Sequence, residues 1–433
     1  MQKRVLAGGA VGQFIEFYDF SLYGLSALIL AKQFFPAESA FAGLLATFAA
    51  FGVAFVVRPL GGLFFGALGD RIGRRPVLFI TLMAIGVATA GIGLLPAFGT
   101  LGYLAPVALV LLRLVQGFSA GGESVGAPAF VLEHAPVERR GLWLCITLSA
   151  TALPGVLSGG LILAIHGIFG AAAYAEWAWR LPFLLALPLS VMGFWIRRRT
   201  EESPEFQKVL KAAAAKEYSP VREAFRSNGR RMAQVTLICG LTALAFYNLA
   251  GYFVTFLQTS AGLSREASLA INASVMVVLA LVSPFAGLLS DRIGRRPMLQ
   301  IGSAAMAVIA VPAFLMIVSG QLWLVIAGQL LYVLPLAFYS AGSSTVFVEI
   351  FQTRTRFTSA AVSYNVGYAL LGGTAPIIGT WLVQSTGSAV SPGIYLAVYA
   401  AAVALLVRFG GVPETHPLHG RATADRTPAT ITN

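Results

Sequence analysis

The sequence predicts an all-α membrane protein of twelve transmembrane helices in two pseudo-symmetric six-helix bundles. Hydrophobic residues make up 57% of the chain and charged residues 11%, where an ordinary soluble domain has roughly 25% charged residues. The segment GALGDRIGRRP at residues 66–76 returns as GLLSDRIGRRP at residues 287–297, about half a chain length later. A repeat of this length in an apolar chain indicates two homologous helix bundles.

Twelve apolar stretches are long enough to cross a bilayer, which takes about 20 residues of helix. They lie at 5–34, 43–67, 77–95, 104–132, 142–166, 178–196, 233–258, 267–289, 298–318, 322–349, 358–384 and 390–410.

One long hydrophilic connector divides these stretches into two groups of six. Residues 197–232, rich in Glu, Lys and Ala, form a cytoplasmic linker with a surface helix between an N-terminal bundle (1–196) and a C-terminal bundle (233–410). Residues 411–433 contain Pro, Thr and Gly and are expected to form a disordered cytoplasmic tail.

The positive charges fall on one set of alternate connectors. That set holds 25 of the 30 Lys and Arg residues, and the other holds Lys32 and Arg265. The positive-inside rule places both termini in the cytoplasm of a multi-pass protein of the cell (inner) membrane. The net charge of +12 therefore reflects topology, and we expect membrane lipid rather than nucleic acid as a partner, and a monomer.

Ionisable residues inside the spans are concentrated in the first half. Such residues are costly in lipid and are functional candidates by default. Glu16, Asp19 and Tyr23 share one face of the first span because they are three and four residues apart. Asp19 falls near the bilayer middle, where the side chain of Arg113 in the fourth span can reach it.

Three further polar residues of the first half belong to the same set. Arg58 precedes a proline in the second span, and Gln116 and Glu123 lie near the stripe of Arg113 in the fourth. Glycines at 117, 121, 122 and 126 give the fourth helix a small-residue surface that a neighbouring backbone can approach.

The second half offers neutral, aromatic and hydrogen-bonding residues instead. Glu349, at the end of a span, is its one carboxylate inside these stretches. The neutral candidates are Tyr247, Asn248, Tyr252, Gln329, Tyr332, Tyr339, Ser343, Tyr364, Asn365 and Tyr368. We expect a substrate to bind between this wall and the charged first half, with contacts from Arg58, Gln116, Tyr23, Tyr247, Asn248, Tyr339, Tyr364 and Asn365.

The repeated loops carry chemistry of their own. A carboxylate beside several guanidinium groups can pair with them or with a nearby helix N-terminus, and such a latch can form in one conformation and open in another. The expected cytoplasmic gating residues are Asp70, Arg71, Arg74 and Arg75 in one loop, Asp291, Arg292, Arg295 and Arg296 in the other, and Glu133, Arg139, Arg140, Glu349, Arg354 and Arg356 at neighbouring helix ends.

These motifs resemble the major facilitator superfamily over essentially the full chain. The two GxLxDRxGRRP loops match its loop signature, and Arg113-Leu-Val-Gln116-Gly117 matches its helix 4 signature. More narrowly, EFYDFSLYG, RPLGG, RLVQGFSAGGE, WRLPF and EESPEF are similar to the metabolite:proton symporter branch, which includes carriers of proline and betaine, α-ketoglutarate, citrate and shikimate. The resemblance implies a proton-coupled symporter, in which the helix 4 arginine takes part in coupling.

The residues themselves suggest where the proton and the substrate bind. We expect Asp19, with Glu16 or Glu123, to take up the proton beside Arg113, since burial and a neighbouring arginine act oppositely on a carboxyl pKa. The spans of the first half hold three carboxylates and three arginines, Arg180 included, so their charges largely cancel. A zwitterion such as proline or betaine, or a small organic acid, therefore fits better than a di- or tricarboxylate.

Other functions receive less support from the sequence. A di- or tricarboxylate:proton symporter stays as the alternative. Drug:proton antiporters of the superfamily carry Gly-Pro-x-x-Gly-Gly in helix 5, whereas this chain has Pro154-Gly155 and then Gly159-Gly160. An enzyme is not expected, since the four histidines and two cysteines show no metal or catalytic spacing, and neither a cofactor nor a metal is predicted. Charged pairs at mid-depth disfavour a channel.

Overall fold

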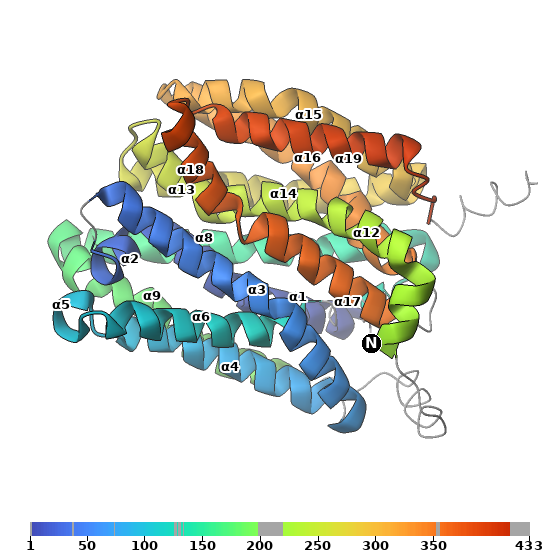
Figure 1. Cartoon of the computed structure of the whole chain (residues 1–433), viewed down its shortest axis with the longest axis horizontal. Helices are drawn as coiled ribbons and strands as arrows, with labels where there is room; N and C mark the ends of the chain where they lie inside the picture. The colour runs from blue at the N-terminus through green and yellow to red at the C-terminus, as the bar shows by residue number, and fades with distance from the viewer. Residues whose placement is uncertain are drawn as a thin grey trace, which may run out of the picture.

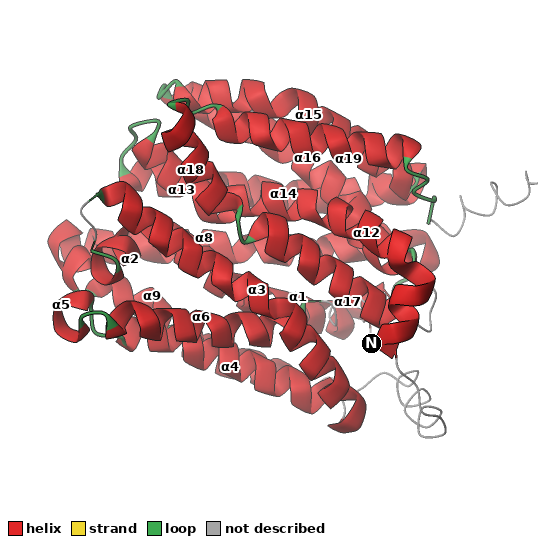
Figure 2. Cartoon of the chain, in the orientation of Figure 1, coloured by secondary structure: helices red, strands yellow, loops and turns green. Residues whose placement is uncertain are grey.

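The computed structural model describes residues 2–36, 39–72, 74–124, 128, 131–132, 134–197, 220–351 and 356–415. These residues form long helices joined by short loops, with no strand among them (Figure 2). Figure 1 shows the first half of the chain as one layer of near-parallel helices and the second half as another beside it.

The first half contains six spans. Its elements are α1 (Gln2–Leu25), α2 (Ala27–Phe34), α3 (Ala40–Ile72), α4 (Arg74–Leu94), α5 (Phe98–Leu101), α6 (Leu104–Glu123), η1 (Val137–Arg139), α8 (Arg140–Glu176), η2 (Ala178–Arg180), α9 (Leu181–Leu184) and α10 (Ala186–Arg197).

The second half repeats this pattern. Its elements are α12 (Pro220–Tyr247), η3 (Asn248–Tyr252), α13 (Phe253–Thr259), α14 (Arg265–Ile293), α15 (Arg295–Val318), α16 (Leu322–Glu349), α17 (Arg356–Gly367), η4 (Tyr368–Gly372), α18 (Ala375–Thr386) and α19 (Ser391–Phe409).

The described helices account for the twelve predicted spans. Ten helices are long and apolar enough to cross a membrane, and α1 with α2 forms an eleventh span bent by 68°. The shorter apolar part of α4, Phe79–Leu94, is the twelfth. The predicted fold class is therefore confirmed.

Several described spans depart from a continuous α-helix, among them the first, the seventh and the eleventh. The break between α1 and α2 falls at Ser26. Residues 248–252 (η3) and 368–372 (η4) are π-helical and interrupt the seventh and eleventh spans. π-Helical turns inside α-helices are rare and are frequent at functional sites. η4 includes Tyr368, whose ring centre lies 6.0 Å from the Arg58 guanidinium carbon.

The repeated loop forms a tight turn between α14 and α15. Gly294 adopts a φ of 99° there, in the region that favours glycine. The start of α1 and the end of α19 lie on the same side of the molecule as this turn (Figure 1), and we call that side the terminal face. The break at Ser26 lies toward the other side, the opposite face.

Glycines allow α3 and α6 to pack closely. A Cβ atom at Gly61 would meet the backbone of Phe118, one at Gly117 the backbone of Ala54, and one at Gly121 the carbonyl of Arg58. The small-residue surface predicted for the fourth span is thus confirmed, and α3 is the neighbour that uses it. This contact fixes the position of Arg58 in the helix pair.

Candidate functional site

The first buried ion pair joins Asp19 on α1 to Arg113 on α6. Arg113 Nη1 donates to Asp19 Oδ2 at 2.9 Å and to Gln116 Oε1 at 2.9 Å. Gln116 Nε2 donates to Asp19 Oδ1, and Thr89 Oγ1 on α4 donates to the same oxygen at 2.9 Å. The Asp19 carboxylate thus accepts hydrogen bonds from three side chains while both charges are fully buried.

A second buried pair lies almost one helical turn closer to the terminal face. Arg58 Nη2 on α3 donates to Glu16 Oε1 and to Ser124 Oγ, just after α6. Ser124 Oγ also lies 2.6 Å from Glu16 Oε1. Glu123 interacts electrostatically with Glu16, so two carboxylates and one guanidinium share this part of the first half.

Aromatic rings of the second half cover the Arg58 pair. The guanidinium carbon of Arg58 lies 6.0 Å from the centre of the Tyr368 ring, and 5.2 and 5.3 Å from those of Phe20 and Phe55. Tyr364 stacks on Tyr368 with ring centroids 3.9 Å apart. The charged groups of one half therefore meet the predicted neutral, aromatic wall of the other.

A small cavity of about 60 Å³ lies between the two halves on the terminal side of this wall. Its aromatic lining includes Phe17, Phe246, Phe347, Tyr364 and Tyr368, and its polar lining includes Gln13, Thr147, Thr151, Thr242, Ser340 and Ser343. Sites for small molecules are usually some 300–1,000 Å³, so the halves have to separate before a substrate can enter.

The remaining predicted binding residues have different surroundings. Tyr23 lies 4.3 Å under the Arg113 guanidinium and donates to the carbonyl of Thr47 at 3.1 Å, inside the first half. Tyr339 donates to the carbonyl of Ile238 at 2.9 Å, inside the second. Asn248 is buried in η3. A substrate contact for these three stays a prediction.

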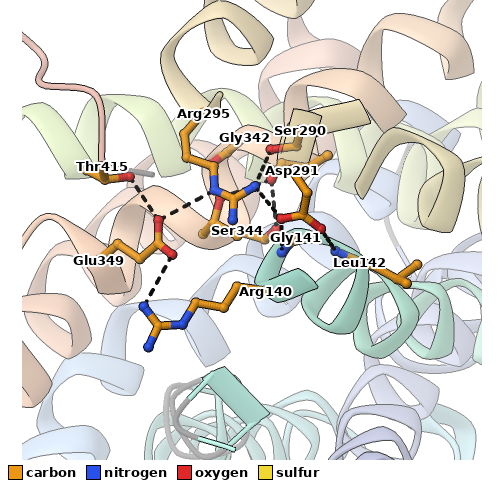
Figure 3. Close-up of polar contacts among 12 residues, drawn as sticks. Arg140, Gly141, Leu142, Ser290, Asp291, Arg295, Gly342, Ser344, Glu349 and Thr415 are labelled. Carbon is orange, nitrogen blue, oxygen red and sulfur yellow. Dashed lines mark hydrogen bonds and ion pairs between the residues drawn. The ribbon is translucent and has the colours of Figure 1, made fainter. Parts of the chain in front are cut away.

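A polar cluster joins the two halves at the terminal face (Figure 3). Asp291, at the end of α14, accepts hydrogen bonds from the backbone N–H groups of Gly141 at 2.8 Å and Leu142 at 2.9 Å, at the start of α8. Arg295 Nη1 lies 2.8 Å from the same carboxylate. A carboxylate on a helix N-terminus is favoured by the exposed N–H groups and by the helix dipole.

Glu349 extends this cluster. It lies 3.5 Å from Arg295 Nε and 4.0 Å from Arg140 Nη1 of the first half. The described partners of Glu349 are Arg295, Arg140 and Thr415, and α15 and α8 bring the two arginines to it from distant parts of the sequence. The pairing of Glu349 with Arg354 and Arg356 stays a prediction, because Arg354 and the Arg356 side chain lie outside the described residues.

Several predicted gating residues lie apart from the cluster. Arg139 and Arg292 are exposed. Arg296 instead donates to the carbonyls of Val407 and Arg408 at the end of α19, at 3.3 and 3.1 Å. The side chains of Asp70, Arg71, Arg74, Arg75 and Arg356, and all of Glu133 and Arg354, lie outside the described residues.

The chain beyond the last helix also reaches the cluster. The carboxylate of Glu414 accepts hydrogen bonds from the backbone N–H groups of Arg295 and Arg296 at 2.9 and 3.0 Å, and Thr415 donates to Glu349 at 3.0 Å. The expectation of disorder from residue 411 onward is thus incorrect for residues 411–415. Glu414 caps the start of α15 and Thr415 bonds to Glu349, and composition alone reveals neither contact.

The two halves also touch toward the opposite face. A Cβ atom at Gly24 on α1 would meet the backbone of Gly251 in η3, and one at Gly52 would meet the carbonyl of Gly373 at 2.9 Å. His166 Nδ1 on α8 lies 3.4 Å from Glu266 Oε1 on α14. The halves are therefore in contact on both sides of the buried pairs.

The sequence analysis missed two hydroxyl residues of the site. Thr89 bridges Asp19 and Gln116, and Ser124 bridges Arg58 and Glu16. Ser124 directly follows Glu123, a predicted site residue, so its place in the sequence could have indicated it. Nothing in the sequence around Thr89 distinguishes it from other threonines. Within the described part of the chain, no three His, Cys, Asp or Glu side chains are grouped so as to hold a metal ion.

Comparisons with known proteins agree with this architecture. The family model described as Major Facilitator Superfamily matches residues 9–283, and the one described as Sugar (and other) transporter matches residues 207–419. Solved structures of similar fold include the xylose transporter XylE from E. coli, with a TM-score of 0.74 and 17% sequence identity; the match covers 96% of this chain and 98% of that one. A D-xylose-proton symporter has a TM-score of 0.73 and 21% identity over 95% of this chain and 98% of that one.

Curated relatives match at higher identity. The Proline/betaine transporter of Escherichia coli (strain K12) is 35% identical over 407 residues, which is 92% of this chain and 81% of the relative. The Ectoine/proline transporter ProP of Corynebacterium glutamicum is 34% identical over 432 residues, 96% and 86% of the two chains. With twelve spans, paired bundles and matches of this extent, the chain belongs to the Major Facilitator Superfamily and is a multi-pass membrane transporter of small molecules.

Proposed function

We propose that the protein is a proton-coupled symporter that imports a small zwitterionic osmolyte of the proline or betaine kind, or a small organic acid, by alternating access. The observation that carries the proposal is the balance of buried charge. Arg58 and Arg113 are each already paired with a carboxylate, and Glu123 adds a further one. Little positive charge is left over for two or three substrate carboxylates.

The surroundings of the pairs support a zwitterion. Its carboxylate would bind a guanidinium, Arg58 or Arg113, and its ammonium would face the tyrosines of the second half. Attraction between a cation and an aromatic face reaches about 2 kcal/mol when both are desolvated. The curated relatives include transporters named for proline, betaine and ectoine, and these names favour the same class of substrate.

Proton coupling is assigned to the buried carboxylates. Asp19, with Glu16 or Glu123, takes up the proton beside Arg113. Carboxylates buried inside the spans of transporters commonly form proton relays, because protonation neutralises their charge. The terminal face is cytoplasmic by the distribution of positive charge, and the Asp291–Glu349 cluster closes it. The bundles at 1–196 and 233–410 then move relative to each other around the buried pairs.

Uptake into proteoliposomes tests the proposal. With an inward proton gradient, we expect radiolabelled proline or glycine betaine to accumulate inside, and collapse of the gradient to release it. Movement of a preloaded compound outward under the same gradient would indicate an antiporter. Inhibition by citrate or α-ketoglutarate, with none by proline or betaine, would support the di- or tricarboxylate alternative instead.

A further inference from the structure

The two buried arginines use their donors to different extents. Arg113 donates from Nη1 to Asp19 and Gln116 and from Nη2 to the carbonyl of Phe51 at 3.4 Å. Its aromatic neighbours, such as Tyr23, belong to the first half. Arg113 is therefore enclosed by one bundle, where both Nη atoms donate and Nε alone has no hydrogen-bond partner.

Arg58 is satisfied on one side of its guanidinium group. Nη2 makes the bonds to Glu16 and Ser124, whereas Nε and Nη1 make no bond of full hydrogen-bond geometry although the side chain is fully buried. The Tyr247 hydroxyl of the second bundle is the polar group that interacts with this guanidinium from across the interface. Buried polar groups in folded proteins almost always have a partner. Tyr368, of the second bundle, faces this guanidinium, so its unused donors lie at the interface between the bundles.

Other unpartnered polar atoms lie around the same place. Glu16 Oε2 and both amide atoms of Asn365 are buried without a hydrogen bond. Asn365 Nδ2 would lie 3.3 Å from a Cβ at Gly62, one turn beyond Arg58 on α3. Unused donors and acceptors from both bundles thus surround the Arg58 pair, close to the tyrosine wall of the cavity.

We propose that the substrate's carboxylate takes the place of Glu16 on Arg58, and that Glu16 gives way by taking up the symported proton. This inference rests on the proposed function and specifies how it couples substrate to proton. The proton comes from water on the side where substrate enters and forms an O–H bond on Glu16. It leaves to water on the other side after substrate release, when the Glu16 carboxylate returns to Arg58.

The local charges explain why the exchange requires a proton. Charged and titratable groups from five elements face Glu16, namely Arg58, Glu123, Tyr247, Tyr364 and Tyr368, and the hydroxyl of Ser124 joins them. A substrate carboxylate entering beside ionised Glu16 would place two anions on one buried guanidinium. Such uncompensated charge is strongly unfavourable in a dry interior, and one proton on Glu16 removes it.

Asp19 has a complementary role in this scheme. It lies three residues beyond Glu16 on α1, between Glu16 and the opposite face. Its carboxylate accepts from Arg113, Gln116 and Thr89, so it is placed to relay the proton without exchanging its partners for substrate.

Equilibrium binding to the purified protein tests the exchange. For radiolabelled glycine betaine we expect the wild-type Kd to rise about tenfold per pH unit over the range in which Glu16 loses its proton. Glu16→Gln, which resembles the protonated side chain, should bind betaine with a Kd that does not change with pH. It should exchange betaine across proteoliposomes without accumulating it. Glu176→Gln, which makes the same change at an exposed carboxylate at the end of α8, is the matched control and should keep the wild-type pH dependence of binding.

Choline supplies a matched ligand, since it has the quaternary ammonium of betaine but a hydroxyl in place of the carboxylate. We expect its weak binding to be independent of pH in the wild type. Arg58→Lys, which keeps the charge and loses the planar donors, should weaken betaine binding at least tenfold and leave choline binding unchanged. This variant keeps the test valid if Glu16→Gln does not fold, as judged by its melting temperature.

The outcomes separate this inference from the proposed function. A wild type that accumulates betaine, with a Glu16→Gln variant that keeps the wild-type pH dependence, overturns the exchange at Arg58 alone. The same holds if choline shows the pH dependence of betaine. A wild type that neither binds nor accumulates proline, betaine or a small monocarboxylate overturns the proposed function itself.

Discussion

Asp19 is held by three donors from two different helices besides its own. Arg113 and Gln116 come from α6 and Thr89 from α4. Removing one partner of such a buried ion pair usually costs about 3–5 kcal/mol, because the other charge stays buried. This residue is therefore sensitive both as a proton carrier and as part of the first bundle.

Asp19→Asn should abolish gradient-driven accumulation while substrate exchange continues, because the amide cannot release or accept a proton at neutral pH. Uptake and counterflow of labelled proline in the same proteoliposomes measure the two activities. Asp19→Glu, which keeps the ionisable group, serves as the control and should retain part of the accumulation. Undiminished accumulation by the asparagine variant would rule out Asp19 as a proton carrier.

Among the single residues of the site, the sequence predicted the charged ones better than those with a hydroxyl group. An arginine or carboxylate in an apolar span stands out because it needs a partner, so Glu16, Asp19, Arg58 and Arg113 were identified. Hydroxyl groups do not stand out, since many in these spans bond to their own helix backbone, as Thr147 does to Trp143. Thr89 and Ser124 could be recognised once the helices were packed.

Among the elements, α3 and α6 depend on glycine for their contact. A Cβ at Gly121 would collide with the carbonyl of Arg58, whereas Gly160 on α8 has open space around its Cβ position. The two positions therefore separate the effect of close packing from that of helix propensity, in which alanine exceeds glycine by about 1 kcal/mol.

Gly121→Ala should lower the melting temperature by several degrees and impair transport, since it displaces the backbone that carries Arg58. Gly160→Ala should leave both unchanged or raise stability slightly. Melting of the purified variants and uptake at equal protein amounts make the comparison. Equal behaviour of the two variants would contradict the close packing of α3 on α6.

The contact of Asp291 with the start of α8 links elements of different bundles. Asp291→Asn keeps the size of the side chain but loses the charge that pairs with Arg295 and favours the helix N-terminus. We expect it to shift the population toward states that are open at the terminal face. Spin labels on the ends of α8 and α14 should report longer distances.

Arg140→Gln is the matched control for this change. The Arg140 side chain is 25% exposed and 4.0 Å from Glu349, and such partly solvated pairs contribute about 0–1 kcal/mol. The spin-label distances should therefore change little. If Arg140→Gln opens the terminal face as much as Asp291→Asn does, the Asp291 contact is not the main latch.

Element positions followed from hydropathy, but interruptions of the helices did not. The twelve apolar stretches correspond to the observed spans because burial in lipid requires a run of apolar residues. The bend at Ser26 and the π-helical turns η3 and η4 depend on hydrogen-bond register, which an apolar run does not encode. The tight turn at Gly294 was marked in the sequence by the repeated loop.

For the whole molecule, the two bundles are in contact on both sides of the buried pairs. The latch around Asp291 joins them at the terminal face, and the close approach of Gly24 to Gly251 joins them toward the opposite face. The repeat in the sequence predicted two bundles. It did not predict how near they come, because contact between two glycine backbones leaves no signal in composition.

Gly24→Leu should hold the bundles apart toward the opposite face and stop transport, because its side chain has no room against the backbone of Gly251. Binding of betaine from that side should persist, since the buried pairs are untouched. Gly167→Leu, at a position with open surroundings, should transport normally. Spin-label distances across α1 and η3 would show the separation, and active transport by Gly24→Leu would contradict it.

The π-helical turns have a consequence for how this chain compares with its relatives. A residue inserted into an α-helix rotates everything beyond it by about 100°, unless a π-helical turn absorbs the extra residue. By this argument, an extra residue at η3 or η4 leaves the side chains of α13 and α18 facing the same directions as they would in an unbroken α-helix. A relative with a one-residue gap at residues 248–252 or 368–372 should therefore have an unbroken α-helix there and the same residues facing the partner bundle. A gap elsewhere in these spans would turn those residues away.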